Sequence, residues 1–345
     1  MQAKPRILIV TAAFGEGHNS AARNLALALE MSGCTVTTAD PCLLGAPRLT
    51  AWINLGYRWI TTRTPWLWAK IYRSTDRCDF SKSRLSMMRL PECAMRKMIA
   101  EIQPDAVVST YPLYPYFMPR IDSQLPIFTV VTDSIEINSA WIKSPSTAWF
   151  VSDTETRDQM IRNGLDASRV IDTGFAVHPV FSDMTTIEAD DPCQPFEILY
   201  FATASTRQMK HNTIAMLAAS PEVRVTLVMG KNTRGLLPTA IMLKKKHPGR
   251  LRLIGWTRRV PQLLAKHHIV VGKAGGATVH EAIAARCPML IHHLVPGQEE
   301  GNLKLLESIG AGALADSPAT LANAIADLVS NQATPWRDMK LALLR

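Results

Sequence analysis

The segment Gly272-Lys273-Ala274-Gly275-Gly276-Ala277-Thr278 directly follows the apolar run 269–271. An apolar run that ends at glycines and continues with helical spacing predicts a strand, a tight turn and a helix. Glycine lets the backbone approach a ligand closely, and a helix N-terminus offers free N–H groups and the positive end of its dipole to phosphate. We therefore expect a phosphate site at this turn, with four candidate residues: Lys273, Gly275, Gly276 and Thr278.

Polar residues beyond this turn extend the expected site from a phosphate to a nucleotide sugar. Glu281 lies about one helical turn further on, where its carboxylate can accept both hydroxyls of a ribose. Alternatively, it only complements the helix dipole. The segment 296–302 carries Gln298, Glu299 and Asn302. Such groups suit a sugar, whose hydroxyls each need a donor and an acceptor. Ordinary helix capping does not explain the presence of both Gln298 and Asn302.

A second glycine turn, Gly15-Glu16-Gly17-His18-Asn19-Ser20, follows an apolar run near the N-terminus. It is compatible with a purely structural connection between a strand and a helix. It also resembles a dinucleotide-binding turn, in which Asp40 would hold a ribose. Ser20 replaces the third glycine of that fingerprint, however, and a nicotinamide dehydrogenase would not need the turn at 272–278.

The apolar runs themselves predict the fold. They are short and near-continuous, as in parallel strands buried on both faces, and segments with helical spacing alternate with them. The expected strands are 6–12, 35–39, 106–110, 127–132, 148–151, 170–172, 198–202, 224–229, 251–254, 269–271 and 289–292. The acidic segment 181–195, with two prolines, is expected to be a linker. We therefore predict an α/β fold of two Rossmann-like, doubly wound domains, 1–180 and 196–345.

Length and composition exclude several classes of protein. The 345 residues are enough for two domains with separate cores. No segment approaches the ~18 consecutive apolar residues that a bilayer span needs, and the run 7–10 is too short for a signal peptide. Six scattered cysteines without a CxxC pair predict reduced thiols in the cytosol, and argue against a disulfide scaffold and a zinc site. We expect no bound metal.

Much of the net charge of +9 is concentrated in one segment. Between Arg48 and Lys97 there are eleven Lys or Arg residues against three acidic ones, and four of the eight tryptophans. Basic side chains attract anionic headgroups, and Trp favours the headgroup level, so we expect contact with an anionic membrane surface. Two alternatives are a solvated helical insertion whose aromatic residues pack inward, and a nucleic-acid surface, which we favour least. The candidate membrane residues are Trp52, Arg58, Trp59, Arg63, Trp66, Trp68 and Arg73.

Several motifs, in this order, resemble those of a known family. They are the turn Gly15–Ser20, the run 103–112, Val131-Thr132-Asp133 with Trp141, Gly174 with Pro179, Lys273–Glu281 and Pro296–Asn302. This combination resembles the monogalactosyldiacylglycerol synthases and the processive diacylglycerol glucosyltransferases, a family with the GT-B fold of two Rossmann-like domains that face a cleft. The resemblance extends from about Arg6 to Gly312.

This resemblance implies an inverting glycosyltransferase that moves a hexose from a UDP-hexose to a lipid hydroxyl, with no cofactor and no metal at the diphosphate. Diacylglycerol is the expected acceptor. The protein is expected to bind peripherally to the inner face of the cell membrane, in the cytoplasm, and not to bind nucleic acid. The resemblance assigns uracil to Trp256 and Thr257, the diphosphate to 275–278, the ribose to Glu281, and the hexose to Gln298 and Glu299. Gly17 and Asn302 complete the expected donor site.

An inverting displacement needs a base that takes the proton of the acceptor hydroxyl. His18 is the first candidate because imidazole titrates near 6.5. Its alternatives are to steer the diphosphate or to pack under the loop. Asp133 is the rival, either as the base itself or as the group that orients the histidine. Helix N–H groups are expected to stabilise the departing diphosphate.

The chain also departs from the family pattern. Tyr111 and Asn138 stand where the family usually has histidines, and the loop 202–206 at the start of the second domain has no glycine. Other functions therefore stay open. They are a UDP-sugar transferase or epimerase with a polyprenyl-linked acceptor or none, and a UDP-sugar-binding relative without catalysis.

Overall fold

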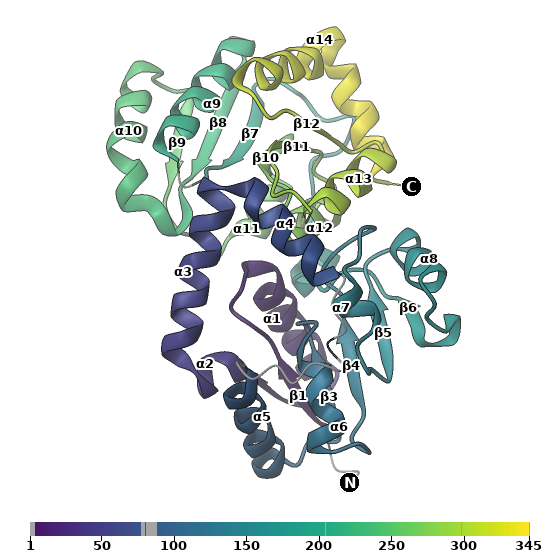
Figure 1. The fold of residues 1–345 in the computed structure, drawn as a ribbon. Coiled ribbons are helices and arrows are strands. Elements are labelled where there is room, and N and C mark those ends of the chain that lie inside the picture. The colour runs from purple at the N-terminus through teal and green to yellow at the C-terminus, as the bar shows by residue number, and fades with distance from the viewer. Residues whose placement is uncertain (1–3, 77–79, 81–87, 204, 298, 345) are drawn as a thin grey trace. The chain divides into compact units, whose positions relative to one another are not determined.

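The computed structural model describes residues 4–76, 80, 88–203, 205–297 and 299–344, without the side chains of Arg58, Thr62 and Pro65. The chain forms two compact units. Unit 1 comprises the residues up to Pro179 together with Val295–Gly301, and unit 2 comprises Val180–Leu294 and the residues from Asn302 onward. Each unit contains one six-stranded parallel sheet (Figure 1).

The sheet of unit 1 has the strand order β2-β1-β3-β4-β5-β6. Its strands are β1 (Arg6–Val10), β2 (Thr35–Ala39), β3 (Ala106–Ser109), β4 (Ile127–Val130), β5 (Ala148–Val151) and β6 (Val170–Asp172). The helices are α1 (Glu16–Met31), α2 (Pro41–Gly45), α3 (Pro47–Arg63), α4 (Pro65–Asp76), α5 (Arg89–Ile102), α6 (Met118–Ile121), α7 (Ser139–Ile142) and α8 (Thr154–Arg162). From β2 the chain returns past β1 to β3, so the topological switch point lies between β1 and β3, where α/β proteins bind ligands at the carboxyl edge.

The strands of unit 1 read as continuous apolar runs because helices cover both faces of the sheet. Leu8 and Val10 of β1 pack in a cluster with Met95 of α5. Ile9, between them, packs in another cluster with Ala22 of α1. Successive residues thus point to opposite faces, and both faces are apolar.

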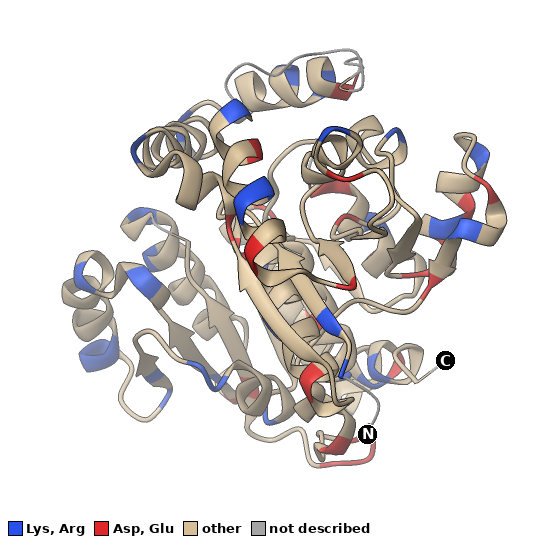
Figure 2. Ribbon diagram, turned by 90° about the horizontal axis from the view of Figure 1, so that it is seen from below, with Lys and Arg blue, Asp and Glu red and all other residues tan. Residues whose placement is uncertain are grey.

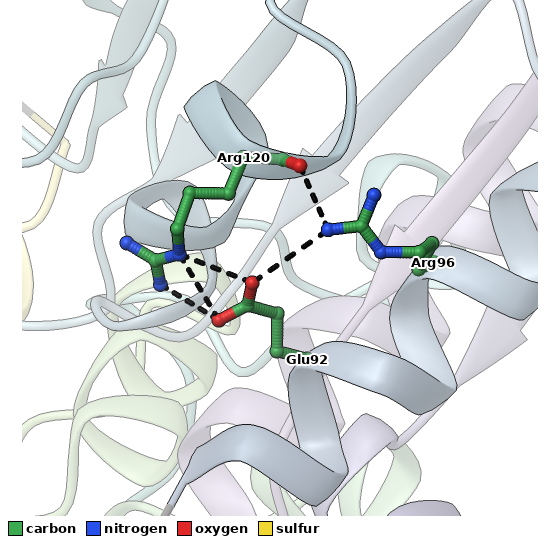
Figure 3. Close-up of polar contacts among 3 residues, drawn as sticks. All are labelled: Glu92, Arg96 and Arg120. Atoms are coloured by element: carbon green, nitrogen blue, oxygen red, sulfur yellow. Dashed lines mark hydrogen bonds and ion pairs between the residues drawn. The ribbon is translucent and has the colours of Figure 1, made fainter. Parts of the chain in front are cut away.

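An ion-pair network joins the helices α5 and α6 of unit 1 (Figure 3). The Arg120 Nε and Nη2 atoms donate to both carboxylate oxygens of Glu92, at 2.8–3.2 Å. Arg96 lies one turn from Glu92 on α5, and its Nη2 atom donates to the Arg120 carbonyl at 2.7 Å. The paired carboxylate raises the pKa of Arg120. A two-pronged contact of this kind fixes the relative position of the two helices.

The sheet of unit 2 has the order β12-β11-β10-β7-β8-β9. Its strands are β7 (Phe196–Phe201), β8 (Val223–Val228), β9 (Leu251–Ile254), β10 (Ile269–Lys273), β11 (Met289–His293) and β12 (Gly312–Leu314). The helices are α9 (Thr206–Ala219), α10 (Thr233–Lys246), α11 (Val260–Ala265), α12 (Gly276–Ala284), α13 (Glu300–Ser308) and α14 (Pro318–Ala342). After β9 the chain crosses back over the sheet, and β10 pairs with the edge of β7 that β8 does not occupy. The switch point therefore lies between β7 and β10.

The core of unit 2 again has two layers. Ile198 and Tyr200 of β7 share a cluster with helix α14, whereas Leu199 shares one with Val279 of α12. The helix α14 is kinked at Ser330–Ala333. Beyond the kink Trp336 is fully buried, and its Nε1 atom donates to the His268 carbonyl at 2.6 Å.

The fold class predicted from the sequence, two Rossmann-like α/β domains, is confirmed. Every expected strand is present, and four of them, β2, β5, β6 and β9, have the expected bounds. The strand β12 was not expected, because it has only three residues, none of them buried. None of the described helices is both long enough and apolar enough to traverse a bilayer.

Candidate active site

Unit 1 contains a cavity of about 560 Å³ at the carboxyl edge of its sheet. Its walls come from the β1–α1 turn, from the helices α3 and α4, and from the loops after β3 and β4. Most of the lining is aromatic or aliphatic, and the polar exceptions include His18, Asp133 and Asn138. The structure therefore brings the two candidate bases, which lie 115 residues apart in the sequence, to one apolar cavity.

His18 stands in the first turn of α1, behind a glycine that the backbone requires. Gly15 caps this helix with φ 148°, a conformation that side chains disfavour. The His18 Nδ1 atom lies 2.9 Å from the Thr132 Oγ1 atom, and Tyr111 packs edge-on against the ring at 5.4 Å. Burial lowers the pKa of His18 to about 4, although a hydrogen bond with the Thr110 backbone opposes this shift. The imidazole is therefore neutral at pH 7.

Asp133 lies in the loop after β4. Its Oδ2 atom accepts a hydrogen bond of 2.8 Å from the Trp141 Nε1 atom. Burial raises the pKa of Asp133 to about 6, and the Trp141 hydrogen bond works in the opposite direction. Asp133 is thus ionised at pH 7 and is a stronger base than His18. A general base is most effective when its pKa lies near the working pH.

Two of the departures from the family pattern, Tyr111 and Asn138, also lie at this cavity. Tyr111 packs against His18, and burial raises its pKa, so its phenol is protonated at neutral pH. Asn138 is buried and caps α7 by accepting from the Ala140 N–H at 3.0 Å. Its amide nitrogen lies 3.5 Å from the Tyr72 carbonyl of α4. Asn138 therefore connects the loop after β4 to α4, which also lines the cavity.

The glycine turn of unit 2 has the expected form. Gly275 is the N-cap of α12, and because glycine has no side chain, the first N–H groups of the helix have no side-chain cap. Gly276, Thr278 and Glu281 are half-buried on this helix, whereas Lys273 is exposed at the end of β10. The turn follows β10, at the switch point, next to the loop after β7.

The glycine-free loop after β7 presents hydroxyl groups. The Thr203 Oγ1 atom donates to the Gln208 Oε1 atom at 2.8 Å, and Ser205 caps α9 by accepting from the Gln208 N–H. Both hydroxyls therefore have local structural partners. Ala204, which stands between them in the sequence, lies outside the described residues.

The other expected donor residues have different surroundings. Trp256 is 56% exposed, and the Arg258 guanidinium lies over its ring, 5.4 Å from the centroid. The Thr257 hydroxyl accepts a hydrogen bond from the Arg259 N–H. Gly17 is half-buried in the first turn of α1. Gln298 lies outside the described residues.

Glu299 and Asn302 have roles in the local structure. The Glu299 Oε2 atom accepts from the Val295 N–H at 3.0 Å, which closes the loop on itself. The Asn302 side chain is 3% exposed, and its amide nitrogen donates to the Ala274 carbonyl at 2.9 Å. Asn302 thereby connects α13 to the glycine turn. Its buried Oδ1 atom has no hydrogen-bond partner among the described residues.

The candidate membrane residues divide into two groups. Trp52 and Trp59 of α3 are 73% and 55% exposed, Trp66 of α4 is 61% exposed, and Arg63 and Arg73 are exposed as well. Trp68 differs from the expectation, because it lines the cavity and its Nε1 atom is buried. The Arg58 side chain lies outside the described residues. Figure 2 shows Lys and Arg on helices of both units, so the described basic residues are not confined to α3 and α4.

Sequence reasoning did not predict that Tyr72 lines the cavity, nor that Trp68 points into it. They are four residues apart on α4, and this helical spacing is the signal that places them on one face. The described residues contain no group of three or more His, Cys, Asp or Glu side chains arranged to hold a metal ion.

Comparison with known families gives a match over the first domain. The model of the family described as monogalactosyldiacylglycerol (MGDG) synthase matches residues 18–177. The resemblance is confirmed. The processive diacylglycerol beta-glucosyltransferase of Staphylococcus epidermidis is 24% identical over 346 residues, which cover 95% of this chain and 86% of the relative. That of Bacillus subtilis is 23% identical, covering 99% of this chain and 91% of the relative. These relatives are glycosyltransferases, the class of enzyme expected.

Solved structures agree on the fold. MurG of Acinetobacter baumannii superposes with a TM-score of 0.64 at 13% identity, covering 99% of this chain and 94% of that one. A putative UDP-N-acetylglucosamine 2-epimerase of Listeria monocytogenes superposes with a TM-score of 0.62 at 15% identity, covering 99% and 91%. The two-domain GT-B architecture is therefore confirmed. Because one protein is named as an epimerase, this likeness does not choose between reactions.

Proposed function

We propose that this protein transfers a hexose from a UDP-hexose to a lipid hydroxyl, with diacylglycerol as the acceptor, at the surface of an anionic membrane. The observation that carries the proposal is the cavity of unit 1, where a carboxylate and an imidazole lie in largely apolar walls. Such a cavity suits an acceptor with one reactive hydroxyl on an apolar body. An epimerase, which acts on the nucleotide sugar alone, has no need of it.

In the proposed reaction Asp133 takes the proton of the acceptor hydroxyl. The acceptor oxygen then bonds to the anomeric carbon of the hexose, the bond from that carbon to the diphosphate breaks, and its electron pair leaves with UDP. Asp133 has this role because burial makes it the stronger base. Neutral His18 lies in the same cavity and hydrogen-bonds the acceptor oxygen. Attack opposite to the leaving group inverts the anomeric carbon.

Unit 2 binds the donor in this proposal. The uncapped N–H groups at Gly275 and Gly276 receive the diphosphate, and Glu281 holds the ribose hydroxyls. The hydrogen-bond donors and the helix dipole stabilise the negative charge that develops on the departing diphosphate. Lys273, Thr278, Trp256 and Thr257 of unit 2 complete the nucleotide site. Asn302 of unit 2 binds the hexose together with Gln298 and Glu299, which belong to the segment Val295–Gly301 of unit 1.

The helices α3 and α4 make the membrane contact. Their exposed tryptophans, Trp52, Trp59 and Trp66, are of the type that prefers the level of the lipid headgroups. The exposed Arg63 and Arg73 attract anionic headgroups. We propose that the protein binds peripherally to the inner face of the cell membrane. No cofactor or metal is part of the proposal.

The proposal is tested by incubating purified protein with UDP-glucose, UDP-galactose, UDP-N-acetylglucosamine and UDP-glucuronate, each with and without diacylglycerol vesicles. We expect UDP release from one of these donors only in the presence of the lipid. Conversion of the nucleotide sugar without lipid identifies an epimerase. Binding of UDP without turnover of any donor identifies a non-catalytic relative.

A further inference from the structure

Two aromatic side chains of α4 face the cavity of unit 1 side by side. Trp68 and Tyr72 are four residues apart, their ring centroids are 6.5 Å apart, and both line the cavity with His18 and Asp133. The Trp68 ring packs edge-on against Tyr57 of α3 at 4.8 Å. Packing therefore holds the Trp68 ring in place.

The position of Tyr72 is fixed as well. Its ring lies against the backbone of Gly297, where a Cβ atom would come within 2.9 Å of the Tyr72 Cδ1 atom. Gly297 also has φ 81°, a conformation that favours glycine. The contact leaves the tyrosine ring little freedom to turn away from the cavity.

Both side chains carry a buried hydrogen-bonding group that has no partner among the described residues: the Trp68 Nε1 atom and the Tyr72 Oη atom. Other buried tryptophans of the chain are satisfied. Nε1 of Trp141 donates to Asp133, that of Trp149 to the Trp141 carbonyl, and that of Trp336 to the His268 carbonyl. An unpaired buried donor lowers stability, and buried polar groups normally have partners. Two such groups on one face of one helix, at one cavity, indicate a ligand that supplies the missing acceptors.

We propose that the Trp68 Nε1–H and Tyr72 Oη–H groups bind the ester carbonyls of a diacyl glycerolipid. The proposal rests on the proposed function and adds the feature of the acceptor that is recognised. A diacylglycerol has one hydroxyl, which goes to Asp133 and His18, and two ester carbonyls, which are hydrogen-bond acceptors only. Indole N–H is a donor only. Burial and the nearby carboxylates of Asp133 and Asp76 raise the pKa of Tyr72, so its phenol keeps its proton.

The test compares two short-chain lipids that differ only at the carbonyls: 1,2-dihexanoylglycerol and its ether analogue 1,2-dihexylglycerol. Calorimetric titration measures the Kd of each with the wild-type protein, Tyr72→Phe and Trp68→Phe. We expect the wild type to bind the diacyl lipid about tenfold more tightly than the ether. Each variant should lose about three- to tenfold of affinity for the diacyl lipid and none for the ether.

Thermal unfolding of the lipid-free variants separates recognition from structure. Tyr72→Phe removes an unsatisfied group, so we expect its Tm to be equal to or above that of the wild type. The matched control is Tyr116→Phe, because the Tyr116 hydroxyl donates to the Ala140 carbonyl at 3.0 Å and Tyr116 does not line the cavity. This control should lower Tm and leave the ratio of the two Kd values unchanged.

Equal affinity of the wild type for the two lipids, or an equal loss of both in the variants, overturns the proposal. Because binding is measured without a donor, this result is independent of turnover. Selective binding of the diacyl lipid without UDP release from any UDP-hexose would support carbonyl recognition and contradict the transferase function.

Discussion

The hydrogen bond from Trp141 to Asp133 determines where the activity of the enzyme should fall with pH. The pKa of Asp133 is about 6, raised by burial and lowered in part by this bond. Trp141→Phe removes the donor. A hydrogen bond to a charged group stabilises it by about 1.5–3 kcal/mol, and about 1.36 kcal/mol corresponds to a change of one unit in pKa. We expect the pKa of Asp133 to rise by about one unit, since water that enters the space left by the indole offsets part of the loss.

The assay is the pH dependence of kcat/KM for diacylglycerol, which reports the free enzyme. For the wild type, kcat/KM should fall about tenfold per pH unit below pH 6, because the protonated carboxyl is not a base. In Trp141→Phe the midpoint should move to about 7, so that about a tenth of the variant is ionised at pH 6, against half of the wild type.

The matched control for this prediction is Trp149→Phe. Trp149 is also buried, but its Nε1 atom donates to the Trp141 carbonyl and not to a carboxylate. It should lower stability without moving the midpoint. A wild-type midpoint near 4, unmoved by Trp141→Phe, would refute the assignment of Asp133 and favour His18, whose pKa is about 4.

Three further predictions concern packing, the donor site and the membrane surface. Gly45→Ala should destabilise the protein by about 1–3 kcal/mol in denaturant unfolding, because the new Cβ atom would clash with the Leu90 carbonyl oxygen. Gly56→Ala, with open space around the new Cβ atom, should not destabilise it. Glu281→Ala should weaken UDP binding in calorimetry by about 10- to 100-fold, with Glu307→Ala as the neutral control; unchanged affinity removes Glu281 from the ribose site. Replacing Trp52, Trp59 and Trp66 together by Ala should reduce cosedimentation with anionic vesicles about tenfold, and Met31→Ala, an exposed residue of α1, should not; equal sedimentation of both variants would contradict the membrane assignment.

The fold could be predicted closely because parallel strands covered on both faces leave a strong pattern. Residues such as Leu8, Ile9 and Val10 are apolar in succession since each packs against one helical layer or the other. The strand β12 lacks this pattern, as Gly312–Leu314 is short and not buried. A strand that is specified mainly by backbone pairing to β11 leaves little trace in the sequence.

The cavity was less predictable than the glycine turns. Gly15, with φ 148°, marks a local backbone requirement, which a sequence displays directly. Composition grouped Trp68 with Trp66 as membrane residues, but which side of α4 faces inward depends on the tertiary packing of Tyr57 and Tyr72. The pKa values of His18 and Asp133 likewise arise from burial, which depends on segments distant in the sequence.

The central claim, that Asp133 is the base of a lipid glycosyltransferase, is tested most directly by measuring glycolipid formation from the active UDP-hexose and diacylglycerol with Asp133→Asn. We predict a loss of activity of about 10²- to 10⁴-fold. Because the pKa of Asp133 lies about two units above its ordinary value, the ionised group opposes folding at pH 7, and its replacement should stabilise the protein by up to about 3 kcal/mol. Asp183→Asn, an exposed control, should change neither quantity. Glycolipid formation by Asp133→Asn at the wild-type rate would contradict the claim.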